Sequence, residues 1–492
     1  MCGDWRSCRN LAAGLLLVLI GCGEHSAAVR ELTVLYTNDE HGWMEGMEEG
    51  QGAAGLVDLW RDREGFSVDG PFLLLSGGDN WTGPAISTWV QGQSMVEVMN
   101  AMGYDATAIG NHEFDFGLEV LQRRIDQAGY PHLSANTRWR DSGNVPRELG
   151  ILPYTVKEVN GLRVAIVGLT TTSTPRTANP RHVASLQFED YEVALRAAVN
   201  ELEARDPDLL FVIAHVCMAA LEPLVQAVAD LEIDLMGGGH CNELVAKRAG
   251  DTILLGGGYH FTAYARARFR YDTARDRLLE VQFDTRRQTA SATRTADSAV
   301  AAIVARWRSQ FQSTLDQVVA WSDGAIDFRS DELRQAVVES WLRWDRDADI
   351  AITNAGGFRT SLPAGEITYN DLVNVMPFEN TIVATQLNGA TVMAALRSGG
   401  RPVVAGLVRR DGQWVLSRTG EPLVDDRIYR VLVNSFMYDG GDNFQVIAGA
   451  DPDGFDTGSH YRQPFVNWLM ELQTSENSPL RLSDPAVASP TL

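Results

Sequence analysis

Short apolar runs alternate with amphipathic stretches through the first half of the chain. The runs are rich in Val, Ile and Leu and end at Gly, Asp or Asn, which is typical of buried strands. We predict strands at Leu32–Tyr36, Phe72–Leu75, Ala106–Ile109, Leu162–Leu169, Leu209–Ala214, Asp234–Met236 and Thr252–Leu255. Between them, an apolar spacing of about 3.6 residues predicts helices at Ser94–Met102, Glu119–Ala128 and Tyr191–Glu203. Alternating strands and helices predict a layered α/β domain.

A longer amphipathic stretch divides the chain. The apolar spacing of residues 293–320 predicts one long helix whose apolar face packs against the rest of the protein. Its apolar stripe comprises Ile303, Trp307, Phe311 and Leu315. At 492 residues the chain is too long for one core, so we expect two domains, at residues 30–290 and 321–472. Residues 476–492 are rich in Ser, Pro and Asp and are expected to form a mobile tail.

Polar side chains gather where five of the predicted strands end. The clusters are Thr37-Asn-Asp-Glu-His-Gly42, Ser76-Gly-Gly-Asp-Asn80, Gly110-Asn-His-Glu-Phe-Asp115, Ala214-His-Val216 and Gly237-Gly-Gly-His-Cys-Asn242. Glycines in most of them let the backbone turn sharply, and four of the nine histidines of the chain lie there. Since ligands of α/β sheets bind at the carboxyl ends of strands, we expect these side chains to converge on one site.

Carboxylate, imidazole and amide groups in this combination suit divalent first-row metals. We predict one ion held by Asp39, His41 and Asn242, and a second held by Asn111, His215 and His240. Asp79 is expected to bridge the two ions, because a carboxylate offers an oxygen to each. Two cations about 3.5–4 Å apart share a water and lower its pKa, so that the hydroxide attacks phosphorus. The donors suit Zn²⁺, Mn²⁺ and Co²⁺ almost equally.

The other residues of the third cluster receive different roles. His112 does not have to be a ligand, because its imidazolium can bind the phosphate and assist the leaving oxygen. Asp115 is expected to orient that ring. Glu113 is expected to be structural and to accept hydrogen bonds from backbone donors around the turn.

Composition and net charge limit the kinds of molecule that the protein is expected to bind. The chain is 45% apolar and 22% charged, as globular proteins are. With 42 basic and 64 acidic residues the net charge is −22, which argues against a nucleic-acid polymer as partner. A small phosphorylated substrate stays compatible, because bound cations invert the local field. The oligomeric state is left open.

The N-terminus predicts export. A basic segment precedes an apolar run from Leu11 to Ile20, shorter than the ~20 residues that span a bilayer. The run ends at Leu19-Ile-Gly-Cys22 and resembles a bacterial lipoprotein signal over residues 1–21, with Cys22 as the lipidated residue. An ordinary secretory signal cleaved near Ala27 or Ala28 is the alternative. We expect a periplasmic or cell-surface protein that touches the membrane only through its lipid.

Two cysteines lie beside candidate metal ligands. Cys217 follows His215 by two positions, and Cys241 directly follows His240. In one interpretation they are small buried residues packed beside the site. In the other they form a disulfide, which an oxidising compartment permits. The sequence leaves both open.

The second half carries aromatic and basic residues in place of metal-like clusters. Its notable segments are Asn354-Ala-Gly-Gly-Phe-Arg359, Leu372-Val-Asn-Val-Met-Pro-Phe-Glu-Asn380 and Asn434-Ser-Phe-Met-Tyr-Asp-Gly-Gly-Asp-Asn-Phe444. Phe378 and Phe436 lie near chain breakers, which favours exposed loops. Two such rings suit a planar base, since stacking contributes ~1–3 kcal/mol per base. Arg359 is placed for bidentate contacts to phosphate.

Several stretches resemble the 5′-nucleotidase family. Those that resemble its metallophosphoesterase half are Leu35-Tyr-Thr-Asn-Asp-Glu-His-Gly42, Gly77-Gly-Asp-Asn-Trp-Thr-Gly83, Gly110-Asn-His-Glu-Phe-Asp-Phe-Gly117 and Gly238-Gly-His-Cys-Asn242. The resemblance covers residues 31–472 and implies a four-layered α/β/β/α sandwich, a joining helix and a second α/β nucleotide-binding domain. It also implies a two-metal site, although many relatives carry Gln or His where this chain has Asn242.

The segments of the second half resemble the family's C-terminal domain. This implies a substrate pocket with Phe378 and Phe436 around the base, Asp442 on the ribose hydroxyls, and Asn354 and Arg359 on phosphate or ribose. Relatives have an Arg-rich run followed by Leu-Gly-Asn-Leu where this chain has Asp327–Ala336. Arg329 is a candidate for the extra phosphate contact, although Asp331 and Glu332 beside it weaken an anion site.

The resemblance implies an exported, metal-dependent phosphoric ester hydrolase that removes the 5′-phosphate of nucleotides. The alternatives that keep the metal site are hydrolysis of 2′,3′-cyclic nucleotides and of UDP-sugars or other nucleotide pyrophosphates. A thiosulfohydrolase shares the Gly-Gly-Asp-x-Trp pattern of Gly77–Trp81, but it resembles Gly-His-Trp-Glu where this chain has Gly110-Asn-His-Glu. A surface binding protein without turnover is expected to have lost a ligand or His112, and this chain keeps them all apart from the conservative change to Asn242.

Overall fold

The computed structural model describes residues 28–48, 50–289 and 297–482. The contacts between residues divide the chain into two compact units. The last boundary between them along the chain falls inside α8 (Ser298–Leu315), between Ala305 and Arg306. Unit 1 comprises described residues up to 81, 92–174 and 185–305, and unit 2 comprises the remainder. The predicted signal segment and Cys22 lie outside the described residues. Within those residues, no helix has the length and apolar character needed to cross a membrane.

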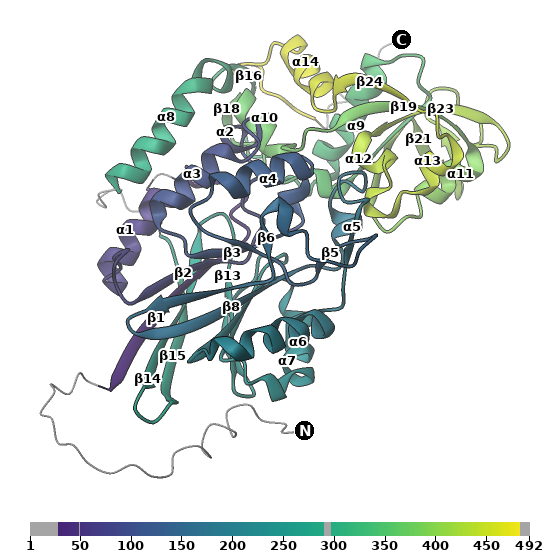
Figure 1. Ribbon diagram of the computed structural model, residues 1–492. Helices are drawn as coiled ribbons and strands as arrows, with labels where there is room; N and C mark the ends of the chain where they lie inside the picture. Colours follow the sequence, from purple (N-terminus) through teal and green to yellow (C-terminus); the bar gives the residue numbers. More distant parts are fainter. Residues whose placement is uncertain (1–27, 49, 290–296, 483–492) are drawn as a thin grey trace, which may run out of the picture. The chain divides into compact units, whose positions relative to one another are not determined.

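Two sheets form the centre of unit 1 (Figure 1). The first has the order β15 (Arg277–Arg287), β14 (Ala263–Asp272), β1 (Val29–Thr37), β2 (Phe72–Ser76), β3 (Ala106–Ala108), β4 (His132–Leu133) and β6 (Ile151–Leu152). The second has the order β12 (Leu244–Ala249), β13 (Thr252–Gly257), β11 (Leu235–Gly238), β10 (Leu209–His215), β8 (Leu162–Thr170) and β7 (Tyr154–Val159). In the first sheet β15, β14 and β1 pair antiparallel, and the strands from β1 to β6 pair in parallel. In the second sheet the edge strands β12 and β7 pair antiparallel and the central strands in parallel, so both sheets are mixed.

The apolar core of unit 1 has two parts. One lies between the two sheets, and the other lies between the second sheet and the helices that cover its outer face. Val34 of β1 and Phe211 of β10 belong to one buried cluster contributed by both sheets. The next residue of β10, Val212, faces the opposite way and packs with the apolar faces of two helices. The helices of this unit are α1 (Gly52–Glu64), α3 (Gln93–Met102), α4 (Leu118–Gln127), α6 (Tyr191–Leu202) and α7 (Met218–Ala227). In Figure 1, α1, α3 and α4 cover the first sheet and α6 and α7 the second. The predicted α/β/β/α layering is confirmed.

Unit 2 is a smaller α/β unit around one mixed sheet. Its strand order is β20 (Pro402–Ala405), β17 (Ile350–Asn354), β23 (Ile428–Asn434), β19 (Thr381–Asn388) and β24 (Phe455–His460). One face of the sheet packs against α9 (Asp331–Trp344) and α14 (Gln463–Glu471). The other face packs against α11 (Gly389–Ala395), α12 (Ser435–Tyr438) and α13 (Val446–Ala450). Outside the sheet lie α10 (Tyr369–Val375) and two short pairs, β16 (Val318–Ser322) with β18 (Gly365–Thr368) and β21 (Leu407–Arg410) with β22 (Gln413–Leu416).

Two predicted boundaries need correction. The helix expected over residues 293–320 ends at Leu315, and Val318–Ser322 forms β16, which pairs with β18. Residues 293–296 lie outside the described residues. The tail expected from residue 476 is wrong over its first part, because Leu480 and Leu482 are buried in the core of unit 2 and Leu480 N donates to Trp321 O at 2.7 Å. Apolar residues spaced among Ser and Pro can still supply a core, which composition alone does not reveal.

Candidate metal and phosphate site

The candidate ligands lie at the end of β10 and just after the ends of β1, β2, β3 and β11. Five of them adopt the left-handed backbone conformation, namely Asp39 (φ 54°), His41 (φ 46°), Asp79 (φ 60°), His240 (φ 72°) and Asn242 (φ 57°). That conformation costs on the order of 1 kcal/mol or more for a residue other than Gly and persists when its surroundings enforce it. For Asp39, His41 and Asp79 a backbone ladder does so, because Asp39 N donates to Gly78 O at 3.0 Å and His41 N donates to Asp79 O at 2.9 Å.

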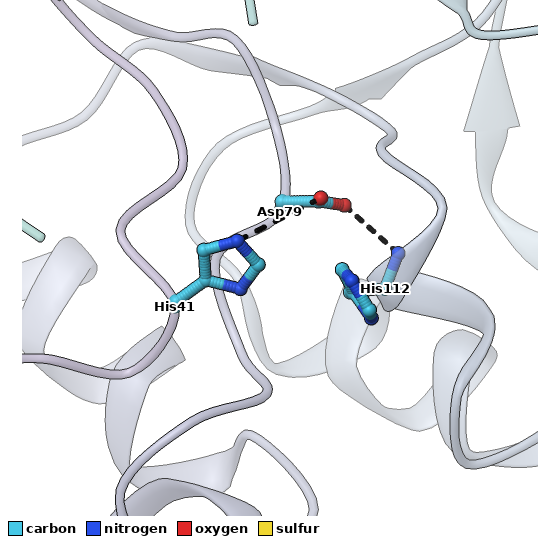
Figure 2. Close-up of side chains that lie close together, drawn as sticks. All are labelled: His41, Asp79 and His112. Carbon is cyan, nitrogen blue, oxygen red and sulfur yellow. Dashed lines mark hydrogen bonds and ion pairs between the residues drawn. The ribbon is translucent and has the colours of Figure 1, made fainter. Parts of the chain in front are cut away.

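Asp79 lies at the centre of the site (Figure 2). Its Oδ2 is 2.9 Å from Nε2 of His215 and 3.9 Å from Nε2 of His41. Its Oδ1 accepts a hydrogen bond from the backbone N–H of His112 at 2.8 Å. Donor atoms of His41, Asp79 and His112 lie within 4.8 Å of one another, and so do those of Asp79, His215 and His240. Asp79 thus belongs to both groups, as a bridging carboxylate must.

The loops around Asp79 approach each other so closely that glycine is required. A Cβ atom on Gly110 would lie 2.1 Å from Oδ1 of Asp79, and one on Gly77 would lie 2.5 Å from the hydroxyl oxygen of Tyr36. Both approaches are possible only without a side chain. The strand-end glycines therefore set the position of the central carboxylate.

Glu113 holds the same two loops together. Its Oε2 accepts hydrogen bonds from the backbone N–H of Asp79 (2.9 Å) and of Gly110 (2.7 Å), and its Oε1 accepts one from Asn80 (2.7 Å). Burial and the neighbouring Asp79 carboxylate raise the pKa of Glu113. The predicted structural role of Glu113 is confirmed.

Two histidines reach Asp79 from the second sheet. His215 is the last residue of β10 and is fully buried. Its Nδ1 is 2.9 Å from Gly77 O, which directs Nε2 toward Asp79, and Nε2 is also 3.2 Å from Nδ1 of His240. His240 is half-buried and follows β11 on a loop. The two histidines therefore differ in how firmly the fold holds them.

His112 and Asp115 pair as the sequence predicts. Nδ1 of His112 is 2.7 Å from Oδ2 of Asp115, across one turn of the short helix that begins at His112. The His112 ring also lies 5.1 Å from the ring of His41, edge to face. By distance alone His112 is close enough to be a ligand together with His41 and Asp79. Its role as acid rather than ligand stays a prediction.

The charges of the site favour a cation. Burial opposes ionisation of Asp79, yet the neighbouring His215, His112 and His41 hold the pKa of Asp79 well below its ordinary value. Burial likewise lowers the pKa of His215, but Asp79 outweighs it and the pKa rises to about 9. An ionised carboxylate beside three imidazoles attracts positive charge. A divalent cation is therefore favourable at this position. The residues present therefore fit a divalent metal.

The other predicted ligands differ in their burial and in their contacts with the site. Oδ1 of Asp39 is 3.9 Å from Nε2 of His41, and Asn38 Nδ2 donates to Asp39 Oδ2 at 2.5 Å. Asn111 is buried directly before His112. Asn242 is exposed, so its place beside Asp39 and His41 stays a prediction.

Sequence reasoning missed His260. It shares the left-handed conformation of the ligands (φ 51°), and its backbone N–H donates to Asp39 O at 3.0 Å. Its ring stacks on Trp43 at 4.9 Å and lies 5.8 Å from the ring of His41. The signal was present, because β13 ends at Gly257 and is followed by Gly-Tyr-His260, much as β11 ends at Gly238 and is followed by Gly-His240.

Cys217 and Cys241 form a disulfide. The interpretation of two separate buried residues is therefore wrong. Cys241 is exposed and Cys217 is half-buried at the start of α7. The parallel pairing of β10 with β11 brings their following loops together, and this pairing cannot be read from a separation of 24 residues.

The candidate substrate residues of unit 2 fall into two groups. In the first, Asn354 Nδ2 donates to Oδ2 of Asp442 at 2.8 Å, and Asn434 Nδ2 donates to Oδ1 of Asn354 at 3.0 Å. A Cβ atom on Gly441 would meet the Phe436 ring at 2.3 Å, so Phe436 lies against the loop that carries Asp442. The amide of Asn354 is thus used to hold Asp442, which sequence reasoning did not foresee.

The second group joins a cation to an aromatic ring. The Arg359 guanidinium lies 5.8 Å from the centre of the Phe378 ring, and Arg359 N donates to Val375 O at 2.9 Å. Arg329 is exposed, with its guanidinium 5.0 Å from the ring of its neighbour Phe328. No contact of the described residues joins Arg329 to either group, so its role stays a prediction.

Known proteins resemble the chain in both sequence and fold. Residues 305–449 match the family model of the 5′-nucleotidase C-terminal domain. A 5′-nucleotidase of Vibrio cholerae serotype O1 is 30% identical over 511 aligned residues, which cover 89% of this chain and 91% of the relative. The chain belongs to the 5′-nucleotidase family. A 5′-nucleotidase precursor from Thermus thermophilus has a TM-score of 0.78 at 25% identity, covering 92% of this chain and 98% of that one.

Family membership makes the chain an enzyme, a phosphoric ester hydrolase whose site holds donors for divalent metal. The sulfate thiohydrolase SoxB of Thermus thermophilus has a TM-score of 0.72, covering 90% of this chain and 94% of that one. At 19% identity that likeness shows the fold alone.

Proposed function

We propose that the chain is an exported 5′-nucleotidase that hydrolyses the phosphomonoester of nucleoside 5′-phosphates at a two-metal site in unit 1. The observation that carries the proposal is the position of Asp79, which belongs to both groups of metal donors. Membership of the 5′-nucleotidase family supports the substrate class. When bound, the two cations lower the pKa of an attacking water and neutralise charge on the phosphoryl oxygens.

The side chains of unit 1 have separate tasks in this proposal. Asp79 would be shared by the two ions, and Glu113 fixes its position by accepting a hydrogen bond from its backbone N–H. His215 is fixed by the contact of Nδ1 with Gly77 O, so that Nε2 would be the nitrogen that binds a metal. His112, with Nδ1 engaged by Asp115, presents Nε2 to a phosphoryl oxygen and donates its proton as the leaving oxygen departs.

Substrate recognition is assigned to unit 2. Phe378 and Phe436 are half-buried rings that we assign to the nucleobase. Asp442, held by Asn354, is assigned to the ribose hydroxyls, and Arg359 to phosphate. Export and a lipid on Cys22 are also part of the proposal and rest on the sequence of residues 1–22.

The test is phosphate release by the metal-loaded mature protein, residues 23–492. The panel contains AMP, ATP, UDP-glucose, 2′,3′-cyclic AMP and bis(p-nitrophenyl) phosphate. We expect AMP to be the preferred substrate. A preference for a diester or for UDP-glucose would keep the metal site but refute the monoester assignment. Silence on every substrate with metal bound would refute the proposed function.

A further inference from the structure

The Cys217–Cys241 disulfide joins the two loops that carry His215 and His240. Cys217 is the residue before α7 and lies two positions after His215, and Cys241 directly follows His240. Such a bond restricts the backbone within one or two residues of each candidate ligand. No other residues of the chain after Cys22 are cysteines, so this bond is specific to the metal site.

The two histidines depend on this bond to different degrees. His215 is fully buried, ends a central strand, and has Nδ1 2.9 Å from Gly77 O. Those contacts hold its ring whether or not the disulfide is present. His240 is half-buried, lies beyond the end of β11 and has φ 72°, in the left-handed region that costs free energy for a residue other than Gly. The bond therefore acts mainly on His240.

Two hydrogen bonds also connect the loops. Gly239 N donates to Val216 O at 3.1 Å, and Met218 N donates to Oε2 of Glu243 at 2.8 Å. They lie on either side of His240, and they preserve the general course of the loop without the disulfide. They are non-covalent and can open and re-form, whereas the covalent bond stays closed until it is reduced. Reduction is thus expected to loosen the loop without unfolding unit 1.

We propose that the Cys217–Cys241 disulfide is a positioning element that keeps His240 in ligating geometry and so sets the affinity of one of the two metals. This inference rests on the proposed function, because it assumes that His215 and His240 hold a cation. A dithiol reverses the effect: the S–S bond breaks, each sulfur takes up one electron and one proton, and the dithiol is oxidised to its own disulfide. The exposed Cys241 gives the reductant access.

The test measures metal affinity directly. Mature protein is compared in its oxidised form, after reduction by dithiothreitol, and as the double variant Cys217→Ser/Cys241→Ser, using chelator competition with Zn²⁺ and the visible absorption of Co²⁺. We expect the dissociation constant of one metal to rise about 10- to 100-fold, the range found when groups that orient metal ligands are removed. The other metal is expected to bind as before, and reoxidation is expected to restore the reduced sample.

A matched control separates positioning from general stability. Val225 is buried on α7, the helix that begins after Cys217, and belongs to the apolar cluster of that helix rather than to the groups of metal donors. Val225→Ala is expected to lower the melting temperature while leaving both metal dissociation constants unchanged. At saturating metal the double variant is expected to keep kcat and the KM for AMP, with only the metal concentration for half activity increased.

The outcomes distinguish the two proposals. Oxidised protein that binds two metals with equal affinity before and after reduction would overturn the positioning role and leave the proposed function intact. An equal loss of affinity in Val225→Ala would also overturn it, because general destabilisation would then explain the effect. Oxidised protein that binds no divalent metal would overturn both.

Discussion

The candidate metal site of unit 1 and the candidate substrate residues of unit 2 are built differently. In unit 1, Asp39, Asp79 and His215 are almost fully buried, and five candidate ligands share a constrained left-handed backbone. In unit 2, Phe378 and Phe436 are half-buried, Arg329 is exposed, and only Asp442 among the candidates has a positive φ, 51°. The first set is held before any ligand arrives, and the second retains freedom to adjust.

This difference has a consequence for mutations. A buried polar network that is fully satisfied loses much when one member changes, because the other members are left without partners. A half-buried ring that contacts a base loses only its share of stacking. We therefore expect all-or-none effects in unit 1 and graded effects in unit 2.

The largest effect is expected at Asp79. Asp79→Asn removes the negative charge that both groups of donors share, so metal binding and phosphate release are expected to fall below detection. Metal content and activity on AMP are the measurements. Asp105→Asn is the matched control, because Asp105 is a carboxylate of the same unit that pairs with Lys157 away from these donors. Full activity in Asp79→Asn would remove the basis for the site.

A smaller effect is expected at His112. His112→Ala is expected to lower kcat by about 10²-fold or more, the usual contribution of a general acid, while two metals stay bound. Metal content by elemental analysis, measured beside kcat, decides the role. Loss of one metal would instead make His112 a ligand, which its distance to His41 and Asp79 permits.

A graded effect is expected in unit 2. Phe378→Ala and Phe436→Ala are each expected to raise the KM for AMP about 5- to 100-fold, which corresponds to the stacking of one base. The KM for p-nitrophenyl phosphate is expected to stay unchanged, because that substrate has no base. Phe455→Ala is the control, since Phe455 is 67% exposed in the same unit and belongs to neither group of candidates. Equal loss on both substrates would show that the rings do not recognise the base.

The smallest effect concerns stability and pH. His132 on β4 is buried between Trp81 and Tyr130, and burial lowers its pKa from 6.5 to about 3. Below pH 6.5 the unfolded chain binds a proton that the folded chain does not, so the folded state loses stability as the pH falls toward 3. At pH 5 the loss is ~2 kcal/mol.

His132→Leu is expected to remove that loss. Denaturant unfolding of the variant and the parent at pH 7.5 and pH 5 gives the difference directly. The transition of unit 1 is expected to become less sensitive to acid in the variant, and the transition of unit 2 to stay the same. An identical pH dependence in both proteins would show that His132 is not the group responsible.

Much of unit 1 could be predicted because short stretches of its sequence determine its strands and the residues at their ends. An apolar strand that stops at glycine and a carboxylate predicts both the strand and the site at its end, as in Phe72–Asp79. Glu113 was assigned correctly because a carboxylate inside a tight turn has backbone donors around it. Strands such as β14, with the pattern Ala-Arg-Ala-Arg-Phe-Arg, were not predicted, because alternating charge also suits an exposed segment.

The rest depended on contacts between distant segments. The disulfide follows from the pairing of β10 with β11, and the place of His260 follows from its hydrogen bond to Asp39. The holding of Asp442 by Asn354 joins residues 88 positions apart. The end of α8 was misjudged because Val318–Ser322 continues the apolar spacing of the helix while pairing with β18. Apart from the glycines that precede His260, these contacts have no signal within a short window of sequence.

The left-handed turns also limit how this site can drift over evolution. Asn, Asp and His are among the few residues other than Gly that such turns accept readily, and they are also the residues that bind divalent metals. At Asp39 and His240, a replacement must therefore satisfy the backbone before its chemistry is tested at all. The residues that these positions tolerate are therefore mostly residues that can bind a metal. A lost ligand is easily regained, and the set of ligands can change while the fold is kept.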